Sequence, residues 1–429
     1  MHRRAAINEE CVTMNLSTSK TQPVQSLDGV SAQPALGRSD AAASGVQQPS
    51  LSLRRLLSVR EMGVYYALIF LVLVLSAITA YTGRANYLTI NNITNVLYQS
   101  SLIAMMAVAM TVILITGNFD LSVASVAALS AAVMVGMADS IGFWPAAFLG
   151  VFVAMLVGVL NGAIVQYLGI NAFIVTLGTL TAIRGVVQIV TDGRSLTVSN
   201  SDALSAMQTF ESGRVHIAWA LLVVGIALAT RGLLVASGSR RAGRGITLPV
   251  FTIVAGVCLI AMSLLGGSDL TVQKPVIYMA AFTGVVWFVL TFTTTGRRVY
   301  AVGGNPEAAR LSGINVKRYK MAAFILCSGV AGVGGVLFGS RLGAINPTAM
   351  QGEELAVIAS AILGGTSLYG GSGSVIKTLA GTLLLVTLSN GFNILDLGAN
   401  YQGLIEGTVI IIAAAIYTVG GSRRGGKSH

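Results

Sequence analysis

The stretch GRRVYAVGGNPEAARLSGINVKRYK, residues 296–320, lies between two long apolar runs and carries six cations against one anion. Its centre has the residues that start and stop a short helix. Asn305 is a favourable N-cap residue, and Pro306 fits the first helical position. Glu307 suits the positively charged helix start, and Gly313 suits the helix end. We expect a capped helix at a membrane surface, which is either a point on which a motor subunit could push or an ordinary cytoplasmic loop held inside by its cations.

The composition around this stretch indicates a membrane protein. Apolar residues make up 54% of the chain, charged residues 10%, and the mean hydropathy is +0.76, whereas about a quarter of the residues in a soluble domain are charged. Gly-x-x-x-Gly pairs at 158–162 and 335–339 have the spacing of close helix contacts in lipid. The predicted fold class is an all-α polytopic membrane protein, a bundle of about 10–12 transmembrane helices.

The basic residues predict which parts of the chain share a side of the membrane. Residues 1–50 are rich in Ser, Gln, Ala and Pro, which predicts a disordered cytoplasmic tail, and residues 51–429 form the predicted transmembrane domain. An even number of predicted spans separates the tail, the cations at 231–244, the stretch 296–320 and the C-terminal cations. The positive-inside rule therefore places all of them, with both termini, in the cytoplasm. The spans are predicted at 62–81, 96–117, 121–138, 143–167, 172–190, 216–236, 248–265, 276–294, 321–339, 353–369, 374–394 and 402–420, which leaves the connections at 81–95, 191–215, 266–275 and 340–352 outside.

Two small, polar and Gly-rich stretches interrupt the apolar pattern: TGNFDLS at 116–122 and GGTSLYGGSGS at 364–374. Irregular backbone at membrane depth lines a cavity or is buried in protein. Paired interruptions in the two halves of a chain point to a transport path. Tight turns at the cytoplasmic surface have the same composition, and the predicted spans favour that second interpretation.

Few ionisable groups lie within the predicted spans, where each is costly unless it is paired. Asp120 begins a span, where it would cap the helix or face a path. Arg184 lies inside an apolar run, where it would snorkel, pair with a carboxylate or face water. Together with Ser122, Thr366 and Ser367, these two residues form the candidate translocation path.

The sequence contains no recognisable motif for catalysis, phosphate binding or metal binding. The run GSGSVIKT at 371–378 resembles a phosphate-binding loop at first sight, but that loop needs Gly before the Lys, where Ile376 stands. The cysteines, Cys11, Cys258 and Cys327, lack the spacing of a zinc site or a disulfide framework. The net charge of +11 comes from cations in loops without interleaved aromatic residues, which argues against nucleic acid as a partner. We expect no enzyme activity, no metal site and no cofactor bound by this chain.

Four elements resemble, in order, the membrane permease subunits of bacterial ABC importers for monosaccharides, the ribose, arabinose and xylose group. They are DLSV at 120–123, NAFIVTL at 171–177 with the Arg-Gly that follows at 184–185, the basic stretch 296–320, and Glu-Leu at 354–355 with ILGGTSL at 362–368. The resemblance extends over about residues 60–420. It implies that 296–320 is the coupling loop that receives a partner ATPase.

The chain departs from the family pattern at several positions. Ala356 stands where the family often has Asp, Ala124 where it usually has Gly, and Asn118 with Phe119 where a small or acidic residue and Ile are usual. An extra hairpin of two spans at about 216–265 is absent from ribose-type permeases and present in xylose-type permeases. The hairpin favours D-xylose as the substrate.

The resemblance implies a division of labour among several proteins in the bacterial inner membrane. A separate ATP-binding-cassette ATPase would bind ATP and Mg²⁺, a periplasmic sugar-binding protein would deliver the sugar, and a second copy of this multi-pass permease would complete a homodimer in the lipid bilayer. The residues implied to couple to the ATPase are Glu307, Ala308, Ala309, Arg310, Leu311, Ser312, Gly313 and Ile314.

A stand-alone sugar transporter driven by an ion gradient is the alternative. Such a transporter needs titratable or ion-coordinating groups near the middle of the membrane. Asp120, Arg184 and Glu406 are a small set for that task.

Overall fold

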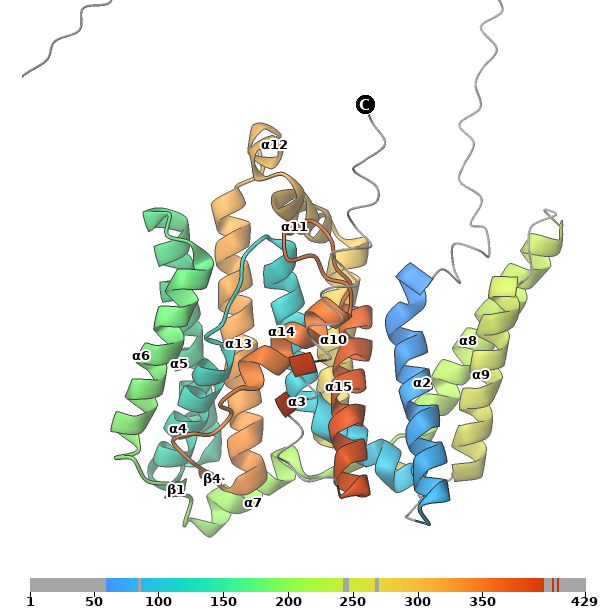
Figure 1. Cartoon of the computed structure of the whole chain (residues 1–429), viewed down its shortest axis with the longest axis horizontal. Helices are drawn as coiled ribbons and strands as arrows, with labels where there is room; N and C mark the ends of the chain where they lie inside the picture. Colours follow the sequence, from blue (N-terminus) through green and yellow to red (C-terminus); the bar gives the residue numbers. More distant parts are fainter. Residues whose placement is uncertain are drawn as a thin grey trace, which may run out of the picture. The chain divides into compact units, whose positions relative to one another are not determined.

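The computed structural model of this chain describes residues 59–83, 86–241, 247–266 and 270–396, together with 403–404 and 407–408. Within these residues nine helices are long and apolar enough to cross a membrane, and the strands form only two short ladders (Figure 1). The predicted all-α membrane class is confirmed. The predicted tail and most of the predicted last span lie outside the described residues.

The elements follow one another along the chain in this order: α2 (Val59–Tyr81), α3 (Ile90–Ile115), α4 (Val123–Ile141), α5 (Phe143–Ala163), the π-helical turn η1 (Ile164–Leu168), α6 (Ala172–Val190), β1 (Leu196–Thr197), α7 (Ser201–Glu211), β2 (Arg214–His216), α8 (Ala218–Arg241), α9 (Thr247–Gly266), β3 (Thr271–Gln273), α10 (Lys274–Phe292), α11 (Thr294–Gly304), α12 (Pro306–Leu311), α13 (Val316–Leu342), β4 (Ala344–Ile345), α14 (Glu353–Leu363) and α15 (Val375–Leu395).

The predicted span at 353–369 is wrong. Its helix, α14, has only 11 residues, which at about 1.5 Å per residue is roughly half the thickness of the hydrocarbon core. The helix stops because the backbone of Gly365 takes a φ of 79°, which glycine adopts readily and other residues rarely. A hydrogen bond from Thr366 N to Ala361 O (3.1 Å) closes this end.

Helices α3, α4, α13 and α15 form the buried centre of the membrane domain. In the most apolar 18-residue stretch of α3, 83% of the residues are buried, whereas the corresponding share in α2, α6 and α8 is 11%. The exposed apolar side chains of this second group suit contact with lipid. At the centre, the hydroxyl groups of Thr111 in α3 and Thr378 in α15 share a hydrogen bond of 2.6 Å.

Glycine residues let α13 approach its neighbours closely. A Cβ atom on Gly335 would collide with the Ala127 carbonyl group of α4, and one on Gly158 of α5 would lie 2.8 Å from the Phe324 carbonyl oxygen. Both glycines belong to the Gly-x-x-x-Gly pairs of the sequence. The pairs therefore lie at helix contacts, as their spacing predicts.

The connections with few cations meet at one end of the spans. Strand β1 pairs antiparallel with β4, with Leu196 opposite Ile345, and β2 pairs antiparallel with β3, with Val215 opposite Val272. The paired strands come from three of the four connections that the sequence predicts on the external side, those at 191–215, 266–275 and 340–352. The ladders agree with a shared side for those connections.

Helices α8 and α9 form the predicted extra hairpin, and they pack chiefly against each other (Figure 1). A Cβ atom on Gly256 of α9 would lie 2.6 Å from the Gly225 carbonyl oxygen of α8. The Ser263 hydroxyl donates a hydrogen bond to Ala218 O (2.6 Å) at the base of the hairpin. The insertion is thus a self-packed pair of helices.

Candidate coupling site and translocation path

The centre of the predicted coupling loop, residues 296–320, forms a short helix, α12, as its caps predict. The Asn305 side chain accepts a hydrogen bond from Ala308 N (3.0 Å) at the helix start. Gly313 takes a φ of 79° just beyond the helix end. The local sequence alone therefore fixes both ends of α12.

Most of the predicted coupling residues are exposed on this helix and the turn after it. The Leu311 side chain is 80% exposed, and Ala309 is buried. Arg310 Nη2 and Glu307 Oε1 form an exposed ion pair of 2.7 Å across one helical turn. The exposed Leu311 side chain beside this ion pair forms a surface to which another protein can bind. The exposed members are Glu307, Ala308, Arg310, Leu311, Ser312 and Gly313.

Sequence reasoning missed a second helix in the coupling loop, α11. The Thr293 hydroxyl accepts a hydrogen bond from Gly296 N (3.2 Å) and caps its start. Its buried face consists of Gly296, Val299, Val302 and Gly303. The cap and the three-residue spacing of this face are signals in the sequence that predict an amphipathic helix.

Helix α11 packs directly onto the two Gly-rich interruptions at 116–122 and 364–374. Gly371 N donates a hydrogen bond to Ile115 O (2.9 Å), which joins the two interruptions. The Tyr300 hydroxyl of α11 donates to Gly373 O (2.9 Å). The interruptions, far apart in the sequence, therefore lie side by side beneath the coupling loop.

The contact among these three segments has no room for a side chain at Gly303, Gly370 or Gly371. A Cβ atom on Gly303 of α11 would overlap the Ile115 carbonyl oxygen, and one on Gly370 would lie 2.7 Å from the Gly303 carbonyl oxygen and 3.0 Å from the Gly117 Cα atom. We call Gly117, Gly303, Gly370 and Gly371 the glycine junction. It joins α11 to the ends of α3 and α14 and to the start of α15.

Asp120 and Ser122 of the first interruption belong to one buried hydrogen-bond network. Asp120 Oδ1 accepts bonds from Ser122 N (2.9 Å) and the Ser122 hydroxyl (2.5 Å). The Ser122 hydroxyl accepts from Asn161 Nδ2 of α5 (3.0 Å), and Asn161 Oδ1 accepts from the Thr179 hydroxyl of α6 (2.6 Å). The N-cap position of α4 is Ser122, and Asp120 accepts from Ser122 in the turn that precedes the helix, so the predicted cap at Asp120 is displaced by two residues. Asn161, a buried amide within an apolar run, is the member that sequence reasoning missed.

The second carboxylate oxygen of Asp120 has a different environment. It makes no hydrogen bond within ordinary geometry to the described part of the chain. Asp120 lies between the spans α3 and α4, where burial raises the pKa of its carboxyl group, while the side chains of Ser122, Cys327 and Ser328 lower it less. Burial thus favours the neutral form of this carboxyl group.

Thr366 and Ser367 lie in the second interruption, next to the glycine junction. Both are buried. Ser367 N donates to Ser372 O (3.0 Å), which closes the turn, and the Ser367 hydroxyl accepts from Tyr369 N (3.2 Å). These contacts are those of a tight turn, in which Thr366 and Ser367 are buried while Tyr369 is 92% exposed.

Arg184 lies in a separate cluster with α14. Its Nη1 atom donates to Ala349 O (2.6 Å), and its Nη2 atom lies 4.0 Å from Glu354 Oε2. The two side chains are 16% and 14% exposed. Of the three alternatives for Arg184, the structure places it beside a carboxylate. Glu354 starts the half-length helix α14, so the pair ties that helix to α6.

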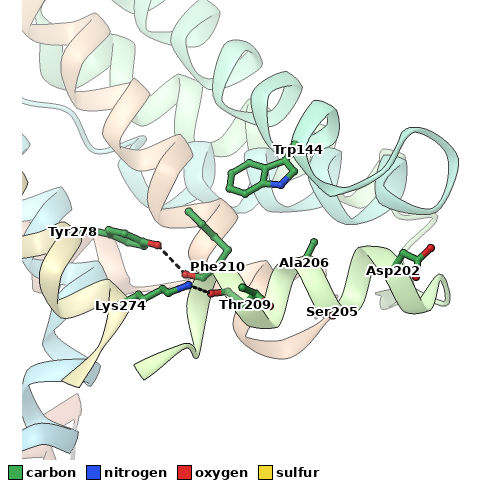
Figure 2. Close-up of a pocket in the computed structure, with 8 residues that line it drawn as sticks. All are labelled: Trp144, Asp202, Ser205, Ala206, Thr209, Phe210, Lys274 and Tyr278. Atoms are coloured by element: carbon green, nitrogen blue, oxygen red, sulfur yellow. Dashed lines mark hydrogen bonds between the residues drawn. The ribbon is translucent and has the colours of Figure 1, made fainter. Parts of the chain in front are cut away.

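The end of the spans that carries the ladders has a charged cluster of its own. Glu211 of α7 is buried, and its Oε1 atom accepts from Arg341 Nε (2.7 Å) and from the Tyr98 hydroxyl (2.6 Å). A groove of about 440 Å³ runs along α7, between Trp144 and Lys274 (Figure 2). The cluster fixes α7 to α3 and α13, and the groove leaves one face of α7 open.

The comparisons with known proteins agree in class. The family described as branched-chain amino acid transport system / permease component matches residues 92–414. The ribose import permease protein of Escherichia coli is 33% identical over 348 residues, which cover 80% of this chain and 90% of that protein. The xylose transport system permease protein of Escherichia coli is 33% identical over 360 residues, 81% of this chain and 90% of that protein. The D-allose transport system permease protein of Escherichia coli is 31% identical over 355 residues, 82% and 90% respectively. No solved structure matches the chain.

Proposed function

This chain belongs to the family of branched-chain amino acid transport system permease components, and on that premise we propose that it is the membrane subunit of an ABC importer for a monosaccharide. The ribose, xylose and D-allose permease proteins to which it is similar are all named for sugars. The family is a class of transport components and not a class of enzymes. The protein is a multi-pass protein of the inner membrane.

One observation carries the mechanism: the exposed helix α12 is connected through α11 to the glycine junction. A partner ATPase binds α12, and closure of the two halves of the ATPase displaces α12 and, with it, α11. The backbone of α11 packs directly against both interruptions, without intervening side chains. A displacement of α11 therefore displaces α3, α14 and α15 as well. The interruptions serve as the hinges on which the central helices rock. Asp120, Ser122, Thr366 and Ser367 belong to those hinges, and Arg184 holds α14 at a second point.

The remaining subunits of the proposed importer follow from this arrangement. ATP and Mg²⁺ bind to the partner ATPase in this proposal. The run at 371–378, which resembles a phosphate-binding loop, packs against α11 and the end of α3. A second copy of this chain completes the pathway. The periplasmic sugar-binding protein docks at the end opposite α12, where the open face of α7 and its groove offer a surface.

The substrate within the sugar class is D-xylose in this proposal. The argument rests on the hairpin α8–α9, which the resemblance assigns to xylose-type permeases. The test is binding of D-xylose, D-ribose and D-allose to the partner periplasmic protein, followed by uptake of each labelled sugar into proteoliposomes that contain the assembled importer. Saturable uptake of D-ribose or D-allose in place of D-xylose would contradict the choice of sugar and leave the importer class intact.

The docking role of α12 is tested by removing its ion pair. The double variant Glu307→Gln with Arg310→Gln keeps side-chain size and helix propensity but removes both charges. We expect it to insert normally, to retain less ATPase on co-purification and to lose ATP-driven uptake. The matched control is Asp192→Asn with Arg194→Gln, an exposed pair (3.8 Å) in the external connection. Equal ATPase retention by the two double variants and the wild type would refute the docking role.

A further inference from the structure

A second pocket, of about 460 Å³, lies where η1 meets the start of α13. Tyr167 forms one side, and Lys317, Arg318, Met321, Ala322 and Ile325 form the α13 side. One candidate membrane span ends at Leu168 and another begins at Val316. The pocket therefore lies at the level of a membrane surface, on the side of the coupling loop.

The polar half of the pocket carries charge of one sign. Lys317 Nζ lies 5.3 Å from the centre of the Tyr167 ring, within the range of a cation–π contact. Neither Lys317 nor Arg318 forms an ion pair with any described residue, and no carboxylate lines the pocket. Asn315 caps Arg318 N (3.1 Å), so the positive end of the long helix α13 points the same way. This half fits an anionic group.

The other half of the pocket is apolar and continues into the membrane-spanning part of α13. Met321, Ala322 and Ile325 lie one helical turn and less apart on one face of α13, and Ala322 is exposed. A free phosphate ion gains nothing from contact with this apolar half. A phospholipid has an anionic headgroup that matches the polar half and acyl chains that match the apolar half.

We propose that this pocket binds an anionic phospholipid, with its headgroup at Lys317, Arg318 and Tyr167 and an acyl chain along Met321 and Ile325. Basic pockets at this level of a membrane protein attract anionic headgroups. The bound lipid would fix the start of α13, the segment that directly follows the turn after α12. The proposal does not depend on which sugar the importer carries or on whether α12 docks an ATPase.

The test measures lipid retention by the purified full-length protein with native mass spectrometry after titration with phosphatidylglycerol or phosphatidylcholine. We expect selective retention of phosphatidylglycerol. The variant Lys317→Gln with Arg318→Gln should retain it about thirtyfold more weakly, about fivefold for each cation near the surface. The matched control, Arg297→Gln with Arg310→Gln, removes two exposed cations from α11 and α12 of the same loop and should stay within about twofold of the wild type.

A second variant separates the lipid from a free anion. Ala322→Trp fills the apolar half and leaves both cations in place, so it should weaken phosphatidylglycerol retention as well. Excess inorganic phosphate should displace little of the lipid. Equal retention of the two lipids, equal weakening by both double variants, or full displacement by inorganic phosphate would each overturn the proposal. So would retention by Ala322→Trp equal to that of the wild type, because it would show that the lipid does not occupy the apolar half of the pocket.

Discussion

Replacing Gly303 with alanine should disrupt the glycine junction, and replacing its neighbour Gly304 with alanine should not. An added Cβ atom on Gly303 would overlap the Ile115 carbonyl oxygen and lie 2.7 Å from Gly371 N. An added Cβ atom on Gly304 would meet nothing closer than the Gly371 Cα atom, at 3.8 Å, an ordinary contact. Both positions lie at the end of α11, so the two variants change helix propensity by similar amounts.

The expected cost follows from the contacts that the new methyl group displaces. Overpacking of a filled site costs about 1–3 kcal/mol. Loss of the bond from Gly371 N to Ile115 O adds about 1 kcal/mol. The sum, about 2–4 kcal/mol, corresponds to opening of the junction that is about 30- to 700-fold more frequent.

Hydrogen exchange of the segment 364–374 measures this opening, and ATP-driven sugar uptake by the assembled importer measures its consequence. Gly303→Ala should speed exchange in this segment and let the ATPase hydrolyse ATP without sugar uptake. Gly304→Ala should match the wild type in both assays. Equal exchange rates for the two variants would refute the packing argument. Normal uptake by a Gly303→Ala protein whose junction has opened would refute the role of the junction in transmission.

Three further predictions concern buried polar groups. Asp120→Asn keeps an oxygen to accept from the Ser122 amide and should cost little, whereas Asp120→Ala should cost about 1–3 kcal/mol in thermal unfolding. Burial raises the pKa of the Asp120 carboxyl group, so the folded state binds its proton more tightly than the unfolded state does. The stability of the wild type should therefore fall as the pH rises above the unfolded pKa. Asp120→Asn should remove this dependence, and a variant whose pH profile matches that of the wild type would contradict the prediction. Arg184→Gln should cost about 3 kcal/mol by leaving Glu354 unpaired, and the added Glu354→Gln change should recover most of the loss, which a double-mutant cycle measures. Glu211→Gln should lower the unfolding temperature and speed exchange in α7; unaltered exchange there would contradict its anchoring role.

Local signals made α12 predictable from sequence. The Asn305 cap, Pro306 at the first turn and the glycine that ends the helix act within a few residues of each other, and no distant contact is needed to choose the helix. The long apolar runs were predictable for a similar reason, because length and composition decide whether a helix can span the membrane. The same reasoning predicted most of the spans and the class of the protein.

Features that depend on distant contacts were not predictable in this way. The apolar run at 353–369 reads as one span, but the φ of 79° at Gly365 ends α14 after 11 residues. The two interruptions were predicted as surface turns, and their turn geometry is correct. Gly303 of α11 packs against Ile115 and Gly371, and no property of either interruption alone specifies that contact.

Partners of the buried charges were also set by the tertiary structure. The sequence left Arg184 with three alternatives, because Glu354 lies 170 residues further along the chain, as their residue numbers show. The network of Asp120 was predictable only as far as the helix cap. Its continuation through Asn161 to α6 requires the packing of α4, α5 and α6 around the cap.

The most direct test of the importer assignment is sugar uptake into proteoliposomes that contain this chain with or without its partner ATPase. With the ATPase and the loaded periplasmic sugar-binding protein present, uptake should require ATP inside the compartment that the coupling loop faces and should continue when ion gradients are collapsed. Without the ATPase, no gradient should drive uptake. Sugar accumulation by this chain alone, driven by a proton or sodium gradient, would contradict the account and favour the stand-alone transporter.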